Sequence, residues 1–392
     1  MPETHKSTNW NKISTVELEE LVRFQLQALW DTDKHHELQK NHNRKISKLI
    51  PPLFIHGAPG VGKSEIIRNI ARSYGIGYRD VRLAQREPID IRGLPVPKDD
   101  GVHWYINAEW PRKKDSRGII IFDELTAADR TLQVAAYEFI LERRLGDLYS
   151  VPEGWYIVGA GNRTSDRAVA TTMSSALANR FLHVEIEPNA ESWIKWALRH
   201  NIHPSVTGFI RFKPDFLFNM EGNLERGWPS PRTWERVSTM LHLTEQNITE
   251  GQRILDISIE GLVGTGVGVE FNAYRKWSDK LTNVRELMLD PKKVMQIPER
   301  ADQKHAICSA MVYHLWRGRD EQESQKLLDG FFRISLELPS DFAAMSIIDA
   351  MFGRDPALAD TYSKKLIEHP LYKNWQKTHG TTLKRTLKSY EN

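Results

Sequence analysis

The chain has 392 residues and a formal net charge of +3. With 40% hydrophobic and 27% charged residues it has the composition of a soluble globular protein, long enough for two or three domains. The charge is too small to argue for a nucleic-acid or membrane partner. Cys308 is the single cysteine, which excludes an internal disulfide and favours a reducing compartment, with the thiol as a small core residue. Residues 1 to 10 contain no apolar stretch and no run approaches membrane-spanning length, so we expect a cytoplasmic protein that is not exported.

The first 45 residues predict a helical N-terminal segment. Residues 13 to 30 carry apolar side chains at helical spacing, and Ser14 or Thr15 could cap the start of this helix. The polar run from 31 to 45 is typical of a solvated helix end or a linker. Its three histidines have no cysteine or paired acid nearby, so a metal site there is not favoured over a solvated surface; they are His35, His36 and His42.

Residues 46 to 190 predict an α/β domain, because short apolar runs alternate with longer helical patterns. The runs at 52–57, 77–83, 118–124, 154–162 and 181–186 are the expected strands. This alternation is typical of a parallel sheet flanked by helices. Most of the runs end in a polar residue or a turn, and ligands of such sheets bind at the carboxyl ends of the strands. We therefore expect these ends to converge on a site.

The remainder of the chain predicts helices only. Residues 191–275 contain helical patterns with proline-marked breaks and form the expected lid, and 276–392 form a helical C-terminal extension. The last twenty residues are basic, with Trp375 and Tyr390 interspersed. A solvated C-terminus is the favoured interpretation of this stretch, and a nucleic-acid-binding tail is the alternative.

The stretch "GAPGVGKS" matches the phosphate-binding pattern G-x-x-x-x-G-K-[ST]. An apolar strand precedes it and an amphipathic helix follows, which is the context that this loop requires. Glycines allow backbone N–H groups to turn toward phosphate oxygens, and the helix N-terminus adds its positive dipole end. Lys63 is expected to reach the β- and γ-phosphates. The predicted nucleotide-binding residues of this loop are Gly57, Ala58, Pro59, Gly60, Val61, Gly62, Lys63 and Ser64.

The run "IIIFDE" supplies a second element, about sixty residues further on. Asp123 is expected to hold Mg²⁺ together with the Ser64 hydroxyl, and Glu124 to polarise an attacking water. A surface acidic turn is the structural alternative. The adjacent pair favours hydrolysis of ATP by water: a metabolic kinase needs its own acceptor base, and the Asn-Lys-x-Asp stretch of a small GTPase is not found.

The order of the P-loop, "IIIFDEL", "VGAGNR", "ALANRF" and "SPR" resembles the AAA+ ATPases, and within them the MoxR-like, dynein-related branch, over residues 50 to 275. The resemblance implies three catalytic residues. Asn162 matches the sensor that helps to place the water, Arg180 the finger that reaches the γ-phosphate of a neighbouring subunit, and Arg232 the lid sensor. Alternatively, Asn162 caps a turn, Arg180 forms a surface ion pair and Arg232 anchors the lid helix.

The resemblance also implies insertions that face a central pore, and the stretches 86–97 and 104–112 are similar to them. Aromatic residues in such loops either grip a client protein or act as packed anchors. The candidates for contact with a client are Gly93, Leu94, Trp104, Tyr105 and Trp110. Arg143 and Arg144 could lie at a subunit boundary, but no role is assigned to them.

The expected function is that of an ATPase that binds ATP and Mg²⁺ and acts as a ring. A finger supplied by a neighbour requires an oligomer, and the family implies a hexamer. The resemblance further implies a chaperone-like protein that remodels a client, often with a partner that has a von Willebrand factor A-type domain. Two alternatives stay open: a nucleotide-gated scaffold with little turnover, and a nucleic-acid-directed motor. The chain departs from the simplest family pattern, because it lacks a long N-terminal domain and carries the C-terminal extension.

Overall fold

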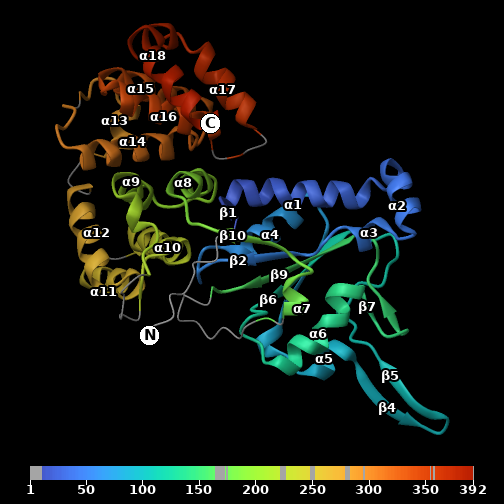
Figure 1. Cartoon of the computed structure of the whole chain (residues 1–392). Coiled ribbons are helices and arrows are strands. Elements are labelled where there is room, and N and C mark those ends of the chain that lie inside the picture. Colours follow the sequence, from blue (N-terminus) through green and yellow to red (C-terminus); the bar gives the residue numbers. More distant parts are fainter. Residues whose placement is uncertain are drawn as a thin grey trace, which may run out of the picture. The chain divides into compact units, whose positions relative to one another are not determined.

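The computed structural model describes residues 11–163, 173, 175–220, 227–247, 252–278, 283–294, 296–353, 355 and 358–391. The chain divides into two compact units, Met1–Pro188 and Asn189–Asn392 (Figure 1). The sequence predicts a finer division into four segments, and this division remains a prediction: 1–45, 46–190, 191–275 and 276–392. No helix in the described ranges combines the length and apolarity that a bilayer crossing needs.

A parallel six-stranded sheet forms the centre of the first unit. Its strands, in spatial order, are β1 (Lys12–Ile13), β10 (Leu182–Ile186), β2 (Leu53–His56), β9 (Trp155–Gly161), β6 (Gly118–Asp123) and β3 (Gly77–Arg82). The five expected strands are thus confirmed. The sequence does not predict the edge strand β1, because two residues carry no alternation and Ile13 fits the helical spacing of the residues that follow. The strands β2, β9 and β6 lie side by side, so their carboxyl ends meet at one edge.

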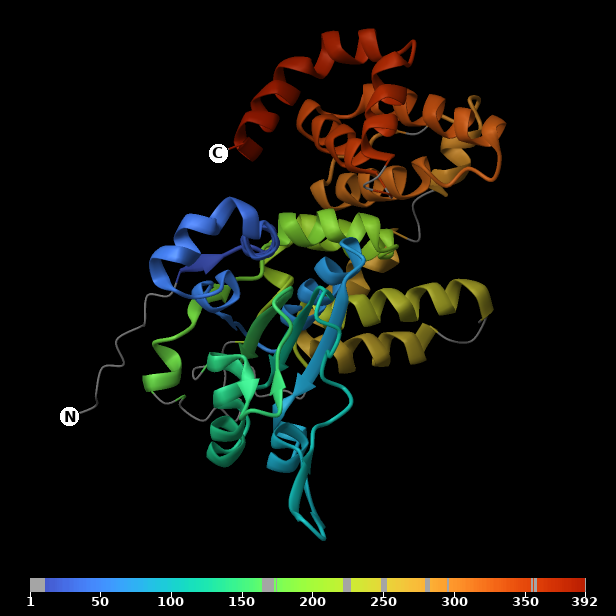
Figure 2. The ribbon, with the colours of Figure 1, turned by 90° about the vertical axis from the view of Figure 1, so that its right-hand side faces the viewer.

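Helices flank this sheet, as the apolar runs of its central strands require (Figure 2). Helix α1 begins where the sequence predicts: the Ser14 side chain accepts from the backbone N–H of Glu17, whose carboxylate accepts from Ser14 in return. The helices of this unit are α1 (Thr15–Trp30), α2 (His36–His42), α3 (Ile46–Leu49), α4 (Lys63–Ser73), α5 (Pro88–Arg92), α6 (Arg130–Glu142) and α7 (Ser175–Ala178), with 3₁₀ turns η1 (Thr32–His35) and η2 (Leu83–Gln85).

The indole ring of Trp155 explains why two strands of the sheet begin with glycine, at Gly77 and Gly118. The ring of Trp155 lies over the first residues of β3 and β6, where a Cβ atom on Gly77 or Gly118 would come within 2.5 Å of it. Its Nε1 donates a hydrogen bond to the Ser116 hydroxyl at 2.9 Å. Because any side chain larger than a hydrogen would displace the ring, these glycines let three neighbouring strands pack at this end of the sheet.

Trp110 lies in the core, so its expected contact with a client is wrong. Its side chain is 1% exposed, and its ring centroid lies 4.4 Å from that of Phe139 on α6. Phe122 of β6 packs against the same cluster, with centroid distances of 6.3 Å to Trp110 and 5.4 Å to Phe139. Burial of this much aromatic surface stabilises the insertion between β3 and β6 against the body of the unit.

Two hairpins complete the first unit: β4 (Leu94–Lys98) with β5 (Gly101–Tyr105), and β7 (Arg144–Leu145) with β8 (Tyr149–Ser150). Arg143, just before β7, is buried and has a left-handed backbone with φ +56°. Its guanidinium donates to the carbonyls of Pro152 at 3.0 Å and Trp155 at 2.7 Å, and burial lowers its pKa to about 10. Arg143 therefore fastens the β7–β8 hairpin to the sheet.

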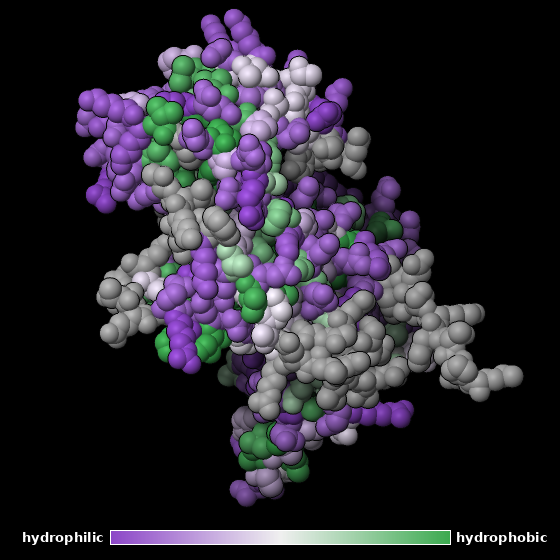
Figure 3. All heavy atoms as spheres, turned by 90° about the vertical axis from the view of Figure 1, so that its left-hand side faces the viewer, coloured by the Kyte–Doolittle hydropathy of each residue, from purple (hydrophilic) through white to green (hydrophobic). Residues whose placement is uncertain are grey.

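The second unit is helical throughout its described residues. Its elements are α8 (Ala190–Arg199), α9 (Pro204–Phe212), η4 (Pro214–Phe216), α10 (Pro231–Asn247), α11 (Gln252–Val263), α12 (Thr265–Ser278), α13 (Val284–Leu289), α14 (Ala301–Leu315), α15 (Glu321–Glu337), α16 (Ser340–Phe352), α17 (Ala359–Glu368) and α18 (Tyr372–Glu391). One apolar core lies among α8 to α12 and another among α13 to α18. A buried ion pair between Arg211 of α9 and Asp349 of α16 joins them. Hydrophilic residues cover most of the C-terminal helices at the top of Figure 3, with smaller hydrophobic areas between them.

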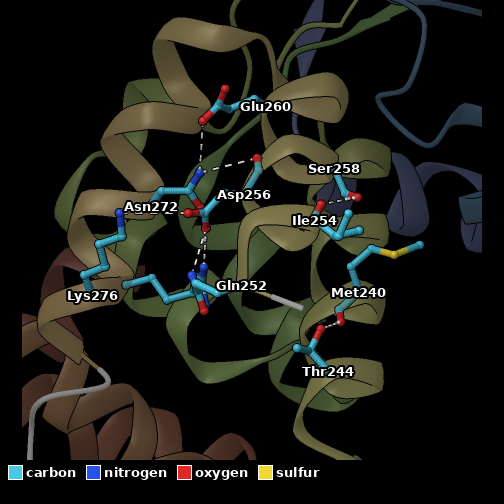
Figure 4. A network of polar contacts seen from close by, with 10 residues as sticks. Met240, Thr244, Gln252, Ile254, Asp256, Ser258, Glu260, Asn272 and Lys276 are labelled. Atoms are coloured by element: carbon cyan, nitrogen blue, oxygen red, sulfur yellow. Dashed lines mark hydrogen bonds and ion pairs between the residues drawn. The ribbon is translucent and has the colours of Figure 1, made fainter. Parts of the chain in front are cut away.

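A polar network holds α11 against α12 in the region that the sequence shows as glycine-rich (Figure 4). Asn272 lies between Asp256 and Glu260 and donates from its side-chain amide to the Asp256 carbonyl and the Glu260 carboxylate, at 3.4 Å each. Arg275, which is buried, donates to the Asp256 carboxylate at 2.6 Å. Gly264, with φ +85°, separates the two helices. The glycine-rich stretch is therefore a helix–turn–helix whose turn needs a left-handed residue.

The basic tail forms the long helix α18, and Trp375 is fully buried in the core of the second unit. Its Nε1 donates to the Ser335 hydroxyl of α15 at 2.8 Å. This indole is therefore not available to a nucleic acid, and the expectation of a solvated C-terminus is wrong for this part of the tail. Basic side chains on the outer face of an amphipathic helix account for the composition that suggested both interpretations.

Candidate nucleotide-binding site

The loop between β2 and α4 has the backbone that its glycines predict. Gly60 has φ +85° and Gly62 has φ +94°, in a region that other residues rarely adopt. A Cβ on Gly57 would lie 3.2 Å from the Val61 side chain, so the start of the loop is also tightly packed. Helix α4 begins at Lys63 directly after this loop. Its first N–H groups have no partners within the helix, which makes this end suitable for an anion such as phosphate.

Lys63 joins the loop to the neighbouring strand. Its side chain is buried, and Nζ donates to the carbonyls of Gly57 at 2.7 Å and Ala58 at 3.1 Å. It also donates to Oδ1 of Asn162 at 3.1 Å. Asn162 directly follows β9, which pairs with β2. Two residues that are 99 positions apart in the chain thus meet at one edge of the sheet.

Ser64 and Asp123 also meet there. The Ser64 hydroxyl donates to one oxygen of the Asp123 carboxylate, and the other oxygen accepts from the backbone N–H of Glu124 at 2.9 Å. A hydroxyl and a carboxylate are hard oxygen donors that suit Mg²⁺. Among the residues that the structure describes, no cluster of three or more His, Cys, Asp or Glu side chains could hold a metal. Mg²⁺ usually keeps several waters and binds through one or two protein oxygens together with substrate phosphates, and the Ser64 and Asp123 oxygens fit this pattern.

Glu124 has an unusual backbone for a residue with a side chain, with φ +56°. The following turn holds it there: Leu125 donates its N–H to the Ala160 carbonyl at 3.0 Å, and Ala127 donates to the Glu124 carbonyl at 2.9 Å. The buried Gln133 donates to the carbonyls of Leu125 and Ala128 at 3.2 Å each. A left-handed residue that is not glycine costs free energy, and such residues cluster at functional sites. These contacts fix the backbone of Glu124, from which its side chain extends at the carboxyl end of β6.

Two residues of β3 that the sequence does not point to, Tyr78 and Asp80, lie near Ser64 and Asp123. Asp80 is half-buried, and burial raises its pKa, as does the nearby charge of Asp123. Arg68 of α4 donates to Asp80 at 3.3 Å, and the Tyr78 hydroxyl donates to the Ser64 carbonyl at 3.4 Å. The negative charge of Asp80 favours a cation near Asp123. Polar residues inside an expected strand are a signal for such a role in the sequence. Exposure at the edge of the sheet explains polar residues in β3 equally well, so the signal is not specific.

The two predicted arginines lie on exposed surfaces. Arg180 follows α7, in a turn where its N–H donates to the Leu177 carbonyl at 3.2 Å. Arg232 lies in the first turn of α10, in the second unit. The anchor of this helix is Trp234, whose Nε1 donates to the Phe216 carbonyl at 2.8 Å. The catalytic roles of Arg180 and Arg232 remain predictions.

A pair of histidines connects the phosphate-binding loop with the turn of Arg180. His183 of β10 contacts the Ala178 carbonyl at 2.7 Å through Nε2, which must therefore donate. Its Nδ1 then accepts, and His56 of β2 supplies the donor through Nε2 at 2.9 Å. His56 immediately precedes Gly57. Burial, together with the neighbouring His183 and Lys63, which act in the same direction, lowers the pKa of His56 to about 4.

This pair predicts a loss of stability in acid. The unfolded chain protonates His56 near pH 6.5, whereas the folded chain keeps it neutral down to about pH 4, so unfolding takes up a proton in this interval. The free energy of unfolding should therefore fall as the pH is lowered through it, by at most about 3 kcal/mol. Urea unfolding at pH 7 and pH 4 should show that His56→Gln reduces this fall. An equal fall in the variant and the original protein would contradict the prediction.

A family model and a curated protein each match part of this chain. Residues 53–141 match the viral superfamily 1 RNA helicase core domain. A stretch of 183 residues is 25% identical to midasin of Giardia intestinalis, which is 45% of this chain but only 4% of that protein.

Two solved structures are also similar at 13% identity. A candidate ATPase from Cytophaga hutchinsonii aligns with a TM-score of 0.31, over 76% of this chain and 81% of that one. NtrX from Brucella abortus aligns with a TM-score of 0.33, over 90% and 73%. The phosphate-binding loop, the parallel sheet and the helicase-core match lead to one conclusion: this chain contains a P-loop α/β domain, followed by a helical region.

Proposed function

We propose that this protein is a Mg²⁺-dependent ATPase in which water attacks the terminal phosphate of ATP. The observation that carries the proposal is the convergence of Lys63, Ser64, Asp123 and Asn162 through the contacts Lys63–Asn162 and Ser64–Asp123. Lys63 and Ser64 begin helix α4, which follows β2, while Asp123 ends β6 and Asn162 follows β9. Glu124 directly follows Asp123 and has a left-handed backbone. An ammonium, two metal-compatible oxygens and a carboxylate at one helix N-terminus are the groups that ATP hydrolysis needs.

Each side chain has a distinct role in this proposal. The loop N–H groups and Lys63 bind the phosphates, and Lys63 stabilises the charge that develops on them. Ser64 and Asp123 would hold Mg²⁺, which when bound neutralises charge on the phosphate oxygens. Glu124 accepts a proton from the attacking water, and Asn162 orients that water. The contact between Asn162 and Lys63 places the amide next to the phosphate-binding ammonium.

The finer assignment rests on the resemblance to the MoxR-like branch of the AAA+ ATPases. In this proposal the protein assembles as a ring, with six copies expected, and Arg180 of one copy completes the site of its neighbour. Exposure of Arg180 supports such a role, because a finger must reach out of its own unit. Arg232 acts as the lid sensor. Hydrolysis drives remodelling of a client protein, with a von Willebrand factor A-type protein as an expected partner.

Phosphate release measured with ATP tests the proposal. The full chain should release phosphate with Mg²⁺, and addition of EDTA should abolish the release. Lys63→Ala should lower the rate by at least about 100-fold, because a cation at the developing charge is lost. Lys114→Ala, at an exposed lysine ahead of β6, serves as the matched control and should keep the rate. Tight ATP binding with no phosphate release under any condition would favour a nucleotide-gated scaffold and contradict the proposal.

A nucleic-acid-directed motor is the second candidate, and the match to an RNA helicase core domain over residues 53–141 is what favours it. Binding to labelled single-stranded RNA can be measured by filter retention over a salt series. A motor that holds the phosphate backbone should lose affinity steeply as salt increases. RNA that stimulates phosphate release and binds in this salt-dependent manner would replace the protein client in the proposal.

A further inference from the structure

The β4–β5 hairpin is a two-stranded sheet of its own that projects from the first unit beyond α5 and α6 (Figures 1 and 2). Nearly all its residues are exposed, and four of its apolar side chains are about half exposed or more: Leu94, Val102, Trp104 and Tyr105. An exposed sheet with apolar residues is a site where other chains pair, unless the protein blocks its edges. The two edges of this hairpin differ in that respect.

Prolines block the edge of β4. In the antiparallel register, Pro95 faces Trp104 and Pro97 faces Val102, while Val96 faces His103. Proline has no N–H, and antiparallel pairs alternate between those that exchange hydrogen bonds and those that do not. Leu94, Val96 and Lys98 must therefore make the bonds to β5, and the backbones of the prolines face outward. The outer edge of β4 can accept hydrogen bonds but cannot donate them at these two positions.

The edge of β5 is open. Val102 and Trp104 face the two prolines, so they belong to the pairs without hydrogen bonds and their own N–H and C=O groups also point outward. Both residues retain their donors. This edge thus offers the alternating donors and acceptors that an added strand needs. It runs from the turn at Asp99 and Asp100, whose side chains are exposed, to Tyr105.

Side chains add to the difference between the surfaces of the hairpin. One face carries Pro95, Pro97, Val102 and Trp104, all apolar. The other face is partly occupied by its own contacts: the Lys98 ammonium lies 5.3 Å from the centre of the Tyr105 ring, and His103 contacts Asp100 at 2.8 Å. An added strand would extend the apolar face with its own alternate side chains.

The base of the hairpin is fixed to the unit. Gly93 has φ +99° and donates its N–H to the Ile89 carbonyl of α5 at 2.8 Å. A Cβ at this position would lie 2.8 Å from the Tyr105 carbonyl oxygen. The chain therefore leaves α5 through a turn that only glycine allows, and this close approach sets the direction of both strands. A rigid base lowers the entropy that a bound segment must offset.

We propose that the outer edge of β5 binds an extended polypeptide segment by strand addition, and that a segment with alternating apolar side chains and a basic end near Asp99 and Asp100 fits best. The outward N–H and C=O groups of β5 pair with a polypeptide backbone, and the apolar face of the hairpin packs against apolar side chains. The carboxylates of Asp99 and Asp100 favour a basic residue at the end of the segment. The inference deepens the proposed function, on which it rests, since it states the chemical class of client that the ATPase takes up. Strand addition itself needs no nucleotide, so the two are testable separately.

The full chain, without nucleotide, should bind a fluorescent peptide of alternating valine and threonine with a lysine at each end, as measured by fluorescence anisotropy. Val102→Pro removes one outward N–H but keeps the bonds between β4 and β5, as the prolines of β4 already do. This variant should weaken binding by about tenfold, the effect of one lost hydrogen bond. Val102→Ala, which keeps the N–H, should weaken it less. Pro97→Ala should bind at least as well as the original chain.

A second probe does not depend on whether the variants fold. The same peptide with N-methyl groups on all its central residues has identical side chains but cannot donate backbone hydrogen bonds, and it should not bind. Equal binding of both peptides would overturn the proposal, because apolar contact alone would then explain the affinity. So would a chain that pairs with itself through this edge, shown by dimers in sedimentation that Val102→Pro abolishes while no peptide binds. A chain that binds the peptide as expected but releases no phosphate from ATP would contradict the proposed ATPase and leave strand addition in place.

Discussion

Glu124→Gln is expected to bind ATP as well as the original chain and to release almost no phosphate. The amide keeps the size of the carboxylate but cannot accept a proton, so the attacking water loses its base. Positioned bases of this kind contribute about 10²- to 10⁴-fold to a rate, and the loss should fall in this range. The left-handed backbone of Glu124 places the side chain by a turn that the substitution does not touch. Fluorescent-nucleotide titration and phosphate release measure the two effects.

Comparing nucleotide binding with phosphate release shows whether Glu124 acts as a catalytic base or only stabilises the turn. If Glu124 merely held the turn, the substitution would lower thermal stability and weaken nucleotide binding together. Glu37→Gln, at an exposed position of α2, is the matched control and should change neither quantity. Phosphate release by Glu124→Gln at the rate of the control would remove Glu124 from the mechanism.

Arg180→Ala is expected to lower phosphate release by about 10³-fold or more, because an arginine finger stabilises the charge on the transferring phosphoryl group. Because the finger acts on the site of a neighbouring copy, a copy with an intact Arg180 should restore phosphate release at the site of the Arg180→Ala variant. Arg180→Ala keeps Glu124, and Glu124→Gln keeps Arg180, so each variant lacks what the other supplies. Mixing the two inactive proteins should restore phosphate release at those sites where an intact base and an intact finger meet.

The mixture is informative only if the copies associate, so sedimentation with ATP and Mg²⁺ accompanies the rate measurement. Arg199→Ala, at an exposed arginine of the second unit, is the control for loss of surface charge and should remain active. Mixed assemblies that form but stay inactive would show that the finger is another residue. A chain that remains monomeric with saturating nucleotide would contradict the ring itself.

The sequence predicts the site better than its surroundings, for a physical reason. Strands β2, β6 and β9 are apolar runs that must be buried, and the residues that follow them are polar, so both the sheet and the edge at which Lys63, Asp123 and Asn162 meet could be predicted. The glycines at 60 and 62 were predictable in the same way, since the phosphate-binding loop needs left-handed backbone there. Local chemistry determines these features.

Features that depend on distant packing were not predictable. Trp110 and Trp375 stand among polar residues, and only their contacts with Phe139 and Ser335 explain why both are buried. Edge strand β1 is too short to carry a periodic signal, and its pairing with β10 joins segments 173 residues apart. Asp80 lies in a half-exposed strand where a carboxylate would attract no notice. Its place beside Asp123 follows from the order of the strands, which periodicity does not encode.

The structure of Glu124→Gln with ATP and Mg²⁺ tests most directly the claim that one copy's site needs the next copy's arginine. We predict that the γ-phosphate lies within hydrogen-bonding distance of Lys63, that the metal contacts Ser64, and that Arg180 of a neighbouring copy points at the same phosphate. A nucleotide bound away from residues 57–64, or a γ-phosphate with no neighbouring copy beside it, would contradict this account.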